Sequence, residues 1–283
     1  MSEDVLQEIP NEDLPKLINL YKDHQKEAPH VFSLLHTCIA WKRKKPNSNY
    51  LTFFGINGDW LVSGTFILLM QYGCYDFFVF TLDNHYQAIC QALLNTEIID
   101  WTRRMTWNAV MIEHAPTIVT VLELKTPCHQ PISGGFWVLE RERAVAFKPQ
   151  CPDDIYVGKL NQSHVTLINS YWPHRYEGSE VYLGTFIKMN TSYGIFLKSN
   201  DKLVSWGLKD YMGQLRSLHT LPEYQRRGYC TLITKILSKE IAEEGYHPIA
   251  TVVTGNTASE TMLEKLGFHQ IKRCIYFECN SIF

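Results

Sequence analysis

One stretch of the sequence, "QLRSLHTLPEYQRRGYCTLITKILSKEIAEEGY" at residues 214–246, constrains the fold most strongly. Its last part has apolar residues at helical spacing, which predicts a helix over residues 231–244 with one buried side. These apolar residues are Leu232, Ile233, Ile236, Leu237 and Ile241. The first part, residues 214–220, has the pattern of a strand. The turn "QRRGYC" therefore leads directly from a strand into a helix.

Such a turn is suited to binding an anion. The start of a helix leaves several backbone N–H groups unpaired, and the helix dipole adds about half a positive charge there. Gly228 has no Cβ, so the backbone can approach a ligand closely, and Arg226 and Arg227 add net charge. The sequence therefore predicts a diphosphate cradle built mostly from main chain.

Two other phosphate-binding motifs are excluded for this turn, and one structural alternative remains. No Gly-Lys-Ser/Thr follows, so the turn is not a P-loop, and no Gly-x-Gly-x-x-Gly is present, so it is not a dinucleotide fingerprint. A turn that is merely eased by Gly228, with both arginines solvated, stays as the alternative.

The composition is that of an ordinary globular protein. The chain has 283 residues, of which 45% are hydrophobic and 20% charged, enough for one large domain or two of ordinary size. Its 27 basic and 29 acidic residues nearly cancel, so no nucleic-acid or membrane partner is expected. The basic run "WKRKKP" at residues 41–46 could contact nucleic acid or a phosphate, but a solvated loop is the favoured interpretation. The longest apolar run, residues 60–70, is too short to span a bilayer and is expected to form one or two buried strands.

No metal site is expected. The histidines at residues 24, 30 and 36 do not have the spacing of metal ligands on a helix, and no Cys-x-x-Cys pair exists. The eight cysteines are scattered, which indicates reduced thiols in the cytosol. They are Cys38, Cys74, Cys90, Cys128, Cys151, Cys230, Cys274 and Cys279. The N-terminus "MSEDVLQEIPNEDLPK" matches neither a signal peptide nor a typical mitochondrial presequence, so a cytoplasmic location is expected.

The first half of the chain mixes helix and strand patterns. Helices are predicted at residues 14–24 and 85–96, where apolar residues recur at helical spacing. Strands are predicted at residues 49–56, 66–72, 76–82 and 117–125, which are rich in aromatic and β-branched residues. The polar, Pro-containing stretch "FKPQCPDD" at residues 147–154 is typical of a linker. The predicted domains are therefore residues 1–148 and residues 149–283.

The second half has a clearer order, β-α-α-β-β-β-α-β-α-β. The third and fourth of these strands fit a hairpin that turns at Met212-Gly213. Gly245 is placed to end the helix after the diphosphate turn. Thr257 and Glu260 have the spacing of a capping box for the last helix, which Gly267 ends. The order predicts an α/β protein with a mixed sheet and not an alternating Rossmann pattern.

Two motifs resemble a known superfamily. The turn "QRRGYC" between a strand and a helix, then a strand, then "NTASETMLEKLGF" at residues 256–268, resemble the acyl-CoA-binding half of the GNAT acyltransferases. Gln225, Gly228, Asn256 and Leu266-Gly267-Phe268 match the superfamily's pattern in order and spacing over about sixty residues. Upstream, "LINSYW", "EGSEVYLGTFIKMNTSYGIFL" and "TLPEY" resemble the C-terminal domain of the glycine N-acyltransferase-like family, over roughly residues 160–280. The resemblance implies two GNAT-like folds in tandem, of which the N-terminal one is diverged.

The resemblance also implies a binding site for acyl-CoA. Backbone groups of Leu218, His219 and Thr220 would bond the pantetheine arm in a gap between this strand and the next parallel one. The diphosphate would lie on the turn, on Gln225, Arg226, Arg227, Gly228, Tyr229 and Cys230. Asn256 would bond the arm from across the gap, or would only cap the helix that follows. Cys230 could be a reactive thiol if the helix dipole lowers its pKa, although a small residue tolerated at this position is the simpler interpretation.

The catalytic residues are less well matched. The resembling family has a proposed base glutamate at the position of Gln214, and a glutamine cannot accept a proton at neutral pH. The usual GNAT tyrosine acid falls near Leu263, which has no proton to donate. His219 is a candidate base on the same strand because an imidazole pKa suits the task, but a structural role in the core or on the surface is the favoured interpretation. A proton relay through water and main chain is a further alternative. The aromatic side chains of Tyr171, Trp172, Trp206, Tyr276 and Phe277 could line an acyl or acceptor pocket, but most of them are expected to belong to the core.

The expected function is therefore transfer of an acyl group from acyl-CoA to an amine, without a covalent enzyme intermediate. By resemblance, the acceptor would be a small amino acid such as glycine. Two alternatives stay open: an acyl-CoA-binding or interaction protein that lost its base, which Gln214 favours, and a protein N-terminal acetyltransferase, which would need a wide acceptor groove.

Overall fold

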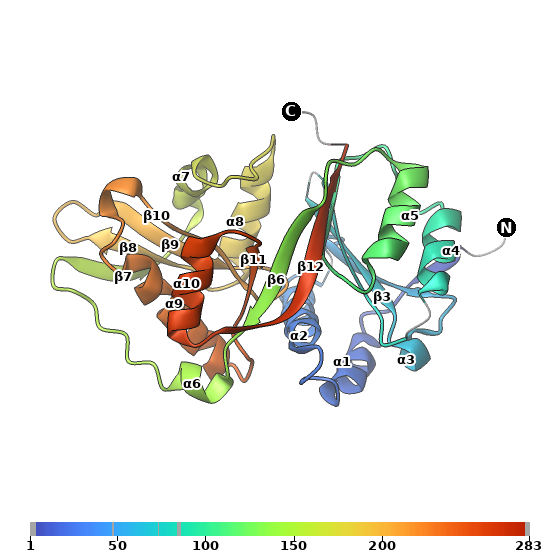
Figure 1. Cartoon of the computed structure of the whole chain (residues 1–283), viewed down its shortest axis with the longest axis horizontal. Helices are drawn as coiled ribbons and strands as arrows, with labels where there is room; N and C mark the ends of the chain where they lie inside the picture. The colour runs from blue at the N-terminus through green and yellow to red at the C-terminus, as the bar shows by residue number, and fades with distance from the viewer. Residues whose placement is uncertain (1–3, 47, 73, 84–85, 281–283) are drawn as a thin grey trace. The chain divides into compact units, whose positions relative to one another are not determined.

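The chain folds into two compact units, which a computed structural model describes for residues 4–46, 48–72, 74–83 and 86–280 (Figure 1). Unit 1 comprises residues 1–135 and 272–283, and unit 2 comprises residues 136–271. The chain therefore leaves unit 1, completes unit 2 and then returns to unit 1.

Unit 1 is a mixed sheet with helices. Its strands lie in the order β1-β2-β3-β4-β5-β12, all antiparallel to their neighbours except β4 and β5, which are parallel. The strands are β1 (Leu6–Glu8), β2 (Leu51–Ile56), β3 (Phe66–Tyr72), β4 (Cys74–Phe80), β5 (Met105–Met111) and β12 (His269–Cys279). The helices are α1 (Leu14–Lys22), α2 (Pro29–Lys44), α3 (Trp60–Ser63), α4 (Gln87–Asn95) and α5 (Ala115–Lys125).

Unit 2 repeats this plan. Its strands lie in the order β7-β8-β9-β10-β11-β6, and β10 and β11 are the parallel pair. The strands are β6 (Ile132–Val138), β7 (Ile155–Lys159), β8 (Tyr193–Leu197), β9 (Leu203–Lys209), β10 (Leu215–Thr220) and β11 (Ile249–Val253). The helices are α6 (Arg141–Val145), α7 (Val165–Ser170), α8 (Ser179–Met189), α9 (Tyr229–Glu243) and α10 (Thr257–Leu266).

The core of unit 2 holds α9 against the sheet. Ile233, Leu237 and Ile241 on one side of α9 are at most 1% exposed and pack against β8, β9 and β10. Burial of each such side chain contributes roughly 1.5–3 kcal/mol. Gly207 on β9 makes the close packing possible, because a Cβ there would lie 2.6 Å from Cγ2 of Ile233.

The structure confirms the predicted element order of the second half, including the turn at Gly213, where φ is 73°. The cap of α10 differs from the prediction. Asn256 and not Thr257 is the N-cap, and its side chain accepts a hydrogen bond from the amide of Ser259.

Several predictions for the first half were wrong. Residues 117–125 form α5 and not a strand, because Ile118, Val121 and Leu122 share a buried helical face, which outweighs their β-branched character. The apolar run at residues 60–70 begins with α3 and then becomes β3. The basic run at residues 41–46 is not a loop throughout, because residues 41–44 are the last turn of α2. Lys42, Arg43 and Lys44 interact favourably there with the negative end of the helix dipole.

The domain boundary also moves, from residue 148 to residue 135. The stretch at residues 147–154 is attached to unit 2, because Phe147 packs against the core that contains α9 and its carbonyl accepts a hydrogen bond from Lys239. The C-terminal strand β12 pairs with β5, so residues 272–283 belong to unit 1. No helix in the described ranges is long and apolar enough to cross a membrane.

A disulfide joins Cys128 to Cys279, so the prediction that all the cysteines are reduced was wrong for this pair. The two residues face each other across an antiparallel bridge, with hydrogen bonds on both sides from the amide of His129 to Glu278 (2.9 Å) and from that of Asn280 to Pro127 (3.2 Å). The bond closes a loop with a sequence separation of 151 residues, and this loop contains all of unit 2.

We expect Cys128→Ser to lower the free energy of unfolding by about 2–4 kcal/mol, because the cross-link restricts the unfolded chain. Chemical denaturation measures the free energy of unfolding. A reductant should lower that of the unaltered protein to the value of the variant. Cys90→Ser, which removes a free thiol from the same unit, is the control. A midpoint that does not respond to reductant would contradict the disulfide.

Two buried histidines in unit 1 should make its stability depend on pH. Burial lowers the pKa of His30 to about 3 and that of His114 to about 4. The unfolded chain binds these protons near pH 6.5 and the folded chain does not, so the unfolded state gains protons first as the pH falls. Stability is therefore complete above pH 6.5 and declines between about pH 6.5 and 4.

We expect this decline to have a slope of about 1.4 kcal/mol per pH unit for each histidine. Denaturation at a series of pH values measures it. His30→Phe should flatten the slope, whereas His269→Phe, at an exposed position, should not. An equal slope in the His30 variant would show that other groups cause the pH dependence.

Candidate functional site

The turn between β10 and α9 leaves a row of backbone amides free. Arg226 and Gly228 both have left-handed backbone conformations, with φ of 61° and 79°. In the described part of the chain, the amides of residues 226–231 have no hydrogen-bond acceptor within the protein, as expected for a helix start without a side-chain cap. A Cβ at Gly228 would meet nothing within 4 Å, so this surface is open to a ligand.

The side chains of the turn fix its shape and give it positive charge. Nε2 of Gln225 donates to the carbonyl of Thr220 (3.3 Å), which ties the turn to the end of β10. The guanidinium of Arg227 donates to the carbonyl of Glu223 (3.5 Å) and lies 5.2 Å from the ring centre of Tyr224. Arg226 is exposed. Both cations therefore lie at the positive end of α9, where an anion is favoured.

Two members of the turn point into the protein. Tyr229 is only 4% exposed and belongs to the core of unit 2, so only its backbone can contact a ligand. Burial raises the pKa of the Cys230 thiol to about 11. The thiol is therefore neutral at pH 7, and the interpretation as a reactive cysteine was wrong.

Strands β10 and β11 separate beside this turn. Their parallel pairing is in register at one position, Leu215 with Ala250, although both strands continue beyond it. On its other side β10 stays paired with β9, apart from a β-bulge between Arg216 and His219, where Ser217 has φ of 51°. Beyond Leu215 the two strands are no longer paired in register, and this unpaired stretch, which leads toward the free amides, is called the wedge below.

The bulge decides which side chains lie on each face of the sheet. Arg216 and His219 are three residues apart and would lie on opposite faces of a regular strand. The bulge brings both to the face of α7 and α8, where the Arg216 guanidinium lies 5.6 Å from the ring centre of Tyr182 and the His219 ring lies 5.0 Å from that of Tyr171. Leu218 packs on the α9 face.

His219 is held as a neutral imidazole among aromatic rings. Its ring centre lies 5.0 Å from those of both Tyr171 and Trp206. Burial lowers its pKa, and its buried Nε2 has no hydrogen-bond partner in the part of the chain that the structure describes. A neutral imidazole nitrogen without a partner is able to accept a proton.

Gln214 is not placed as a base. It is 2% exposed, and its Oε1 accepts a hydrogen bond from the hydroxyl of Thr251 on β11. Leu263, at the position of the GNAT tyrosine, is buried in the core of unit 2. His219 is thus the titratable group of the three candidate positions that lies beside the wedge.

The remaining predicted residues lie around the wedge. The carbonyl of His219 accepts from the hydroxyl of Ser205 (2.8 Å) and that of Thr220 from Gln225, so both carbonyls already have a protein donor. Asn256 follows β11 and is exposed, and its Oδ1 caps α10 by accepting from Ser259 (3.3 Å). The capping role of Asn256 is therefore present.

Sequence reasoning missed three residues of this region. They are Asp210, whose carboxylate holds the turn before β10, Ser217 at the bulge, and Thr251 on β11. Of these three residues, only Asp210 could have been found from the sequence, because it is an acidic residue directly before the predicted turn at Met212-Gly213.

Unit 1 has the same strand plan but fills the corresponding place with side chains. Its parallel strands β4 and β5 are in register from Tyr75 to Phe77 only. Beyond that point, the ring centres of Phe80 at the end of β4 and His114 after β5 lie 5.3 Å apart, and that of Tyr86 lies 4.9 Å from His114. Unit 1 therefore has packed aromatic rings where unit 2 has a wedge.

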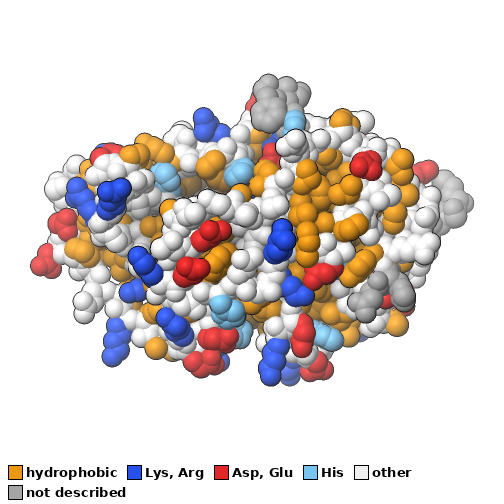
Figure 2. All heavy atoms as spheres, viewed as in Figure 1, with side chains coloured by type: hydrophobic (Ala, Val, Ile, Leu, Met, Phe, Trp, Pro, Cys, Tyr) orange, Lys and Arg blue, Asp and Glu red, His pale blue; other side chains and the backbone are white. Residues whose placement is uncertain are grey.

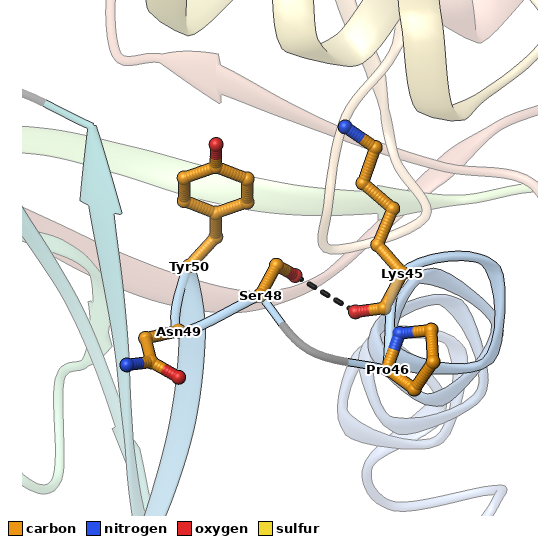
Figure 3. A pocket seen from close by; sticks show the side chains of 5 residues that line it. All are labelled: Lys45, Pro46, Ser48, Asn49 and Tyr50. Carbon is orange, nitrogen blue, oxygen red and sulfur yellow. Dashed lines mark hydrogen bonds between the residues drawn. The ribbon is translucent and has the colours of Figure 1, made fainter.

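One cavity of unit 1 adjoins the predicted basic run. It has a volume of about 500 Å³ and is lined by Lys45, Pro46, Ser48, Asn49 and Tyr50 (Figure 3). Tyr50 stacks on Tyr72 with ring centres 4.5 Å apart, and the hydroxyl of Ser48 donates to the carbonyl of Lys45 (2.9 Å). Basic and acidic side chains are interspersed on the face of the molecule that Figure 2 shows.

Comparisons with protein families match both halves of the chain. Residues 192–277 match the FR47-like protein family, and residues 5–121 match a domain of unknown function, DUF5645. The first match contains β8 to α10, and hence the whole turn and wedge.

Solved structures with the same fold cover almost the whole chain. A Drosophila protein is 22% identical, with a TM-score of 0.89 over 99% of this chain and 100% of that one. A tandem GNAT protein from the clavulanic acid biosynthesis pathway is 12% identical, with a TM-score of 0.61 over 98% of this chain and 99% of that one. A GCN5-related N-acetyltransferase from Kribbella flavida is 13% identical, with a TM-score of 0.53 over 78% and 88%. The chain therefore has a mixed α/β fold of two GNAT-like units in tandem, and its second unit carries the match to the FR47-like family.

Proposed function

We propose that unit 2 binds acyl-CoA and transfers the acyl group to an amine. One observation carries this proposal: the free amides of residues 226–231 follow the end of β10 that is no longer paired in register with β11. The amides and Arg226 and Arg227 can hold a diphosphate, and the wedge has unpaired strand edges that can bond a pantetheine arm. A GNAT fold with an FR47-like match supports the same assignment.

The reaction requires few groups from the protein. A neutral amine nitrogen attacks the thioester carbonyl and a C–N bond forms. The C–S bond then breaks, and the proton that the attacking nitrogen loses passes to the leaving thiolate. The ammonium proton must leave before attack, and we assign its acceptor to His219, whose imidazole is neutral and beside the wedge. The amine that receives the acyl group is proposed to be a small amino acid such as glycine, on the resemblance of residues 160–280 alone.

A second function is favoured by one specific observation. Gln214 is buried and hydrogen-bonded where the resembling family has its proposed base. If His219 has a structural role, the chain binds acyl-CoA without turning it over. Binding and turnover are therefore measured separately.

The cellular location stays a proposal. A cytoplasmic location is proposed, although a disulfide is more common in oxidising compartments. Fractionation of cells with a thiol-trapping reagent would decide between them, because it reports the location and the state of Cys128 together.

We expect CoA to stabilise the protein, by about 2.7 kcal/mol at 100 times its dissociation constant. We expect it to bind once per chain, because packed aromatic rings occupy the corresponding place in the described part of unit 1. Gly228→Ala should abolish most of this effect, since its new Cβ would meet the ligand. Gly178→Ala is the matched control: Gly178 also precedes a helix with φ of 86° and open space around it, so it has the same backbone cost of about 1 kcal/mol. Equal CoA binding by both variants would refute the assignment of the turn.

We expect His219→Phe to lower turnover roughly 100-fold or more, as for loss of a general base, while CoA binding is retained. Release of free thiol from acyl-CoA, with amino acids and short peptides as acceptors, measures turnover. Because burial lowers the pKa of His219, activity should fall only below about pH 6.5, and the variant should lack this acidic limb. Unchanged turnover in the variant would exclude His219 as the base.

A further inference from the structure

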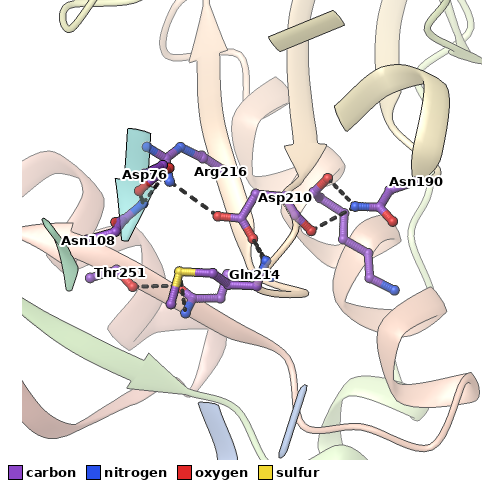
Figure 4. Close-up of polar contacts among 9 residues, drawn as sticks. Asp76, Asn108, Asn190, Asp210, Gln214, Arg216 and Thr251 are labelled. Carbon is purple, nitrogen blue, oxygen red and sulfur yellow. Dashed lines mark hydrogen bonds and ion pairs between the residues drawn. The ribbon is translucent and has the colours of Figure 1, made fainter. Parts of the chain in front are cut away.

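The closed end of the wedge is held by a side-chain hydrogen bond. Leu215 and Ala250 form the pair of β10 and β11 that is in register. Directly beside this pair, the hydroxyl of Thr251 donates to Oε1 of Gln214 (Figure 4). Gln214 is 2% exposed, so water does not compete for this bond. A bond between side chains thus reinforces the strands at the point where they begin to separate.

Gln214 is itself oriented by Asp210. Oδ1 of Asp210 accepts from the amides of Gln214 (3.0 Å) and Met212 (2.9 Å), and Oδ2 accepts from Arg216 (3.3 Å). The backbone carbonyl of Asp210 accepts from the side chain of Asn190 (2.7 Å). Asp210 is also 2% exposed. The carboxylate therefore fixes both residues that flank Leu215, and Arg216 leads directly into the bulge.

The geometry of the wedge depends on this arrangement. The residue after Arg216 is Ser217, whose left-handed conformation is costly for a side chain other than glycine. Such a conformation persists only if the surrounding structure holds it in place. A shift of β10 relative to β11 at Leu215 would move every group that lines the wedge beyond it.

We propose that Gln214, Thr251 and Asp210 act as an apex clamp, which sets the width of the wedge for the pantetheine arm. Gln214 is then a positioning residue and not a base. This proposal rests on the proposed function, since it concerns the same ligand. It also gives a reason for glutamine at this position: a carboxylate there would be a second buried negative charge in the same turn as Asp210.

Thr251→Val tests the clamp, because valine has the shape of threonine without the donor. Two ligands are compared by calorimetric titration: CoA, and adenosine 3′,5′-bisphosphate, which lacks the pantetheine arm. We expect the variant to bind CoA roughly 3–10-fold more weakly, as for loss of one buried hydrogen bond, and to bind the bisphosphate unchanged. Thr251→Ser keeps the hydroxyl and should bind both ligands as the unaltered chain does.

A second variant removes the acceptor of the same hydrogen bond. Gln214→Leu should weaken CoA binding to a similar degree, and the double variant should be no weaker than either single one, because both remove the same bond. Unfolding midpoints confirm that each variant is folded.

The outcomes separate this proposal from the one on which it rests. Equal weakening of CoA and the bisphosphate, or unchanged CoA binding in Thr251→Val, would overturn the clamp while the site itself stands. An additive double variant would also overturn it. Failure of the unaltered protein to bind either ligand would overturn the proposed function and the clamp together.

Discussion

The functional half of this chain depends on one constraint: β10 and β11 pair in register at a single position and then separate. A sheet normally satisfies its backbone groups by pairing with the next strand. Here β10 keeps its pairing with β9 but leaves its other edge open beyond Leu215, and α9 starts from the same end with its first amides unpaired. The open edge of β10 and the free amides of α9 lie at the same end of β10, which is the physical basis for assigning the site.

The two units show how one strand plan can give a site or a core. In unit 1 the parallel strands β4 and β5 also separate, but Phe80, His114 and Tyr86 pack where the strands end. Their burial contributes to stability and leaves His114 neutral. In unit 2 the same place has a glycine with open space and two arginines. The difference is local, since the order of strands is the same in both units.

Local patterns in the sequence predicted the second unit well. In the first unit they predicted α1, α4, β2, β3 and β4, but they missed α2 and β5 and assigned α5 to a strand. The order of elements around "QRRGYC" followed from helical periodicity, turn residues and glycine positions, which are all local properties. Helix α5 was misassigned because residues 117–125 have β-branched side chains whose helical face becomes visible only from their burial. The pairing of β12 with β5 and the Cys128–Cys279 bond join residues far apart in the chain. No local pattern indicates such contacts, so both the domain boundary and the state of these cysteines were missed.

The candidate site shows the same division. The turn residues from Gln225 to Cys230 were found because a strand, a glycine and a helix follow one another in the sequence. The roles of Asp210 and Thr251 depend on contacts across the hairpin and between strands, which composition does not reveal. Gln214 was identified as a departure from the pattern of a resembling family, and only its buried hydrogen bond to Thr251 suggests what the glutamine does instead.

Amide hydrogen exchange with and without CoA tests the central claim most directly. The account predicts that CoA slows exchange at residues 226–231 and along β10 beyond Leu215, and leaves the start of α4 in unit 1 unchanged. Exchange at residues 226–231 that is the same with saturating CoA as without it would contradict the account, because the amides would then not converge on the ligand.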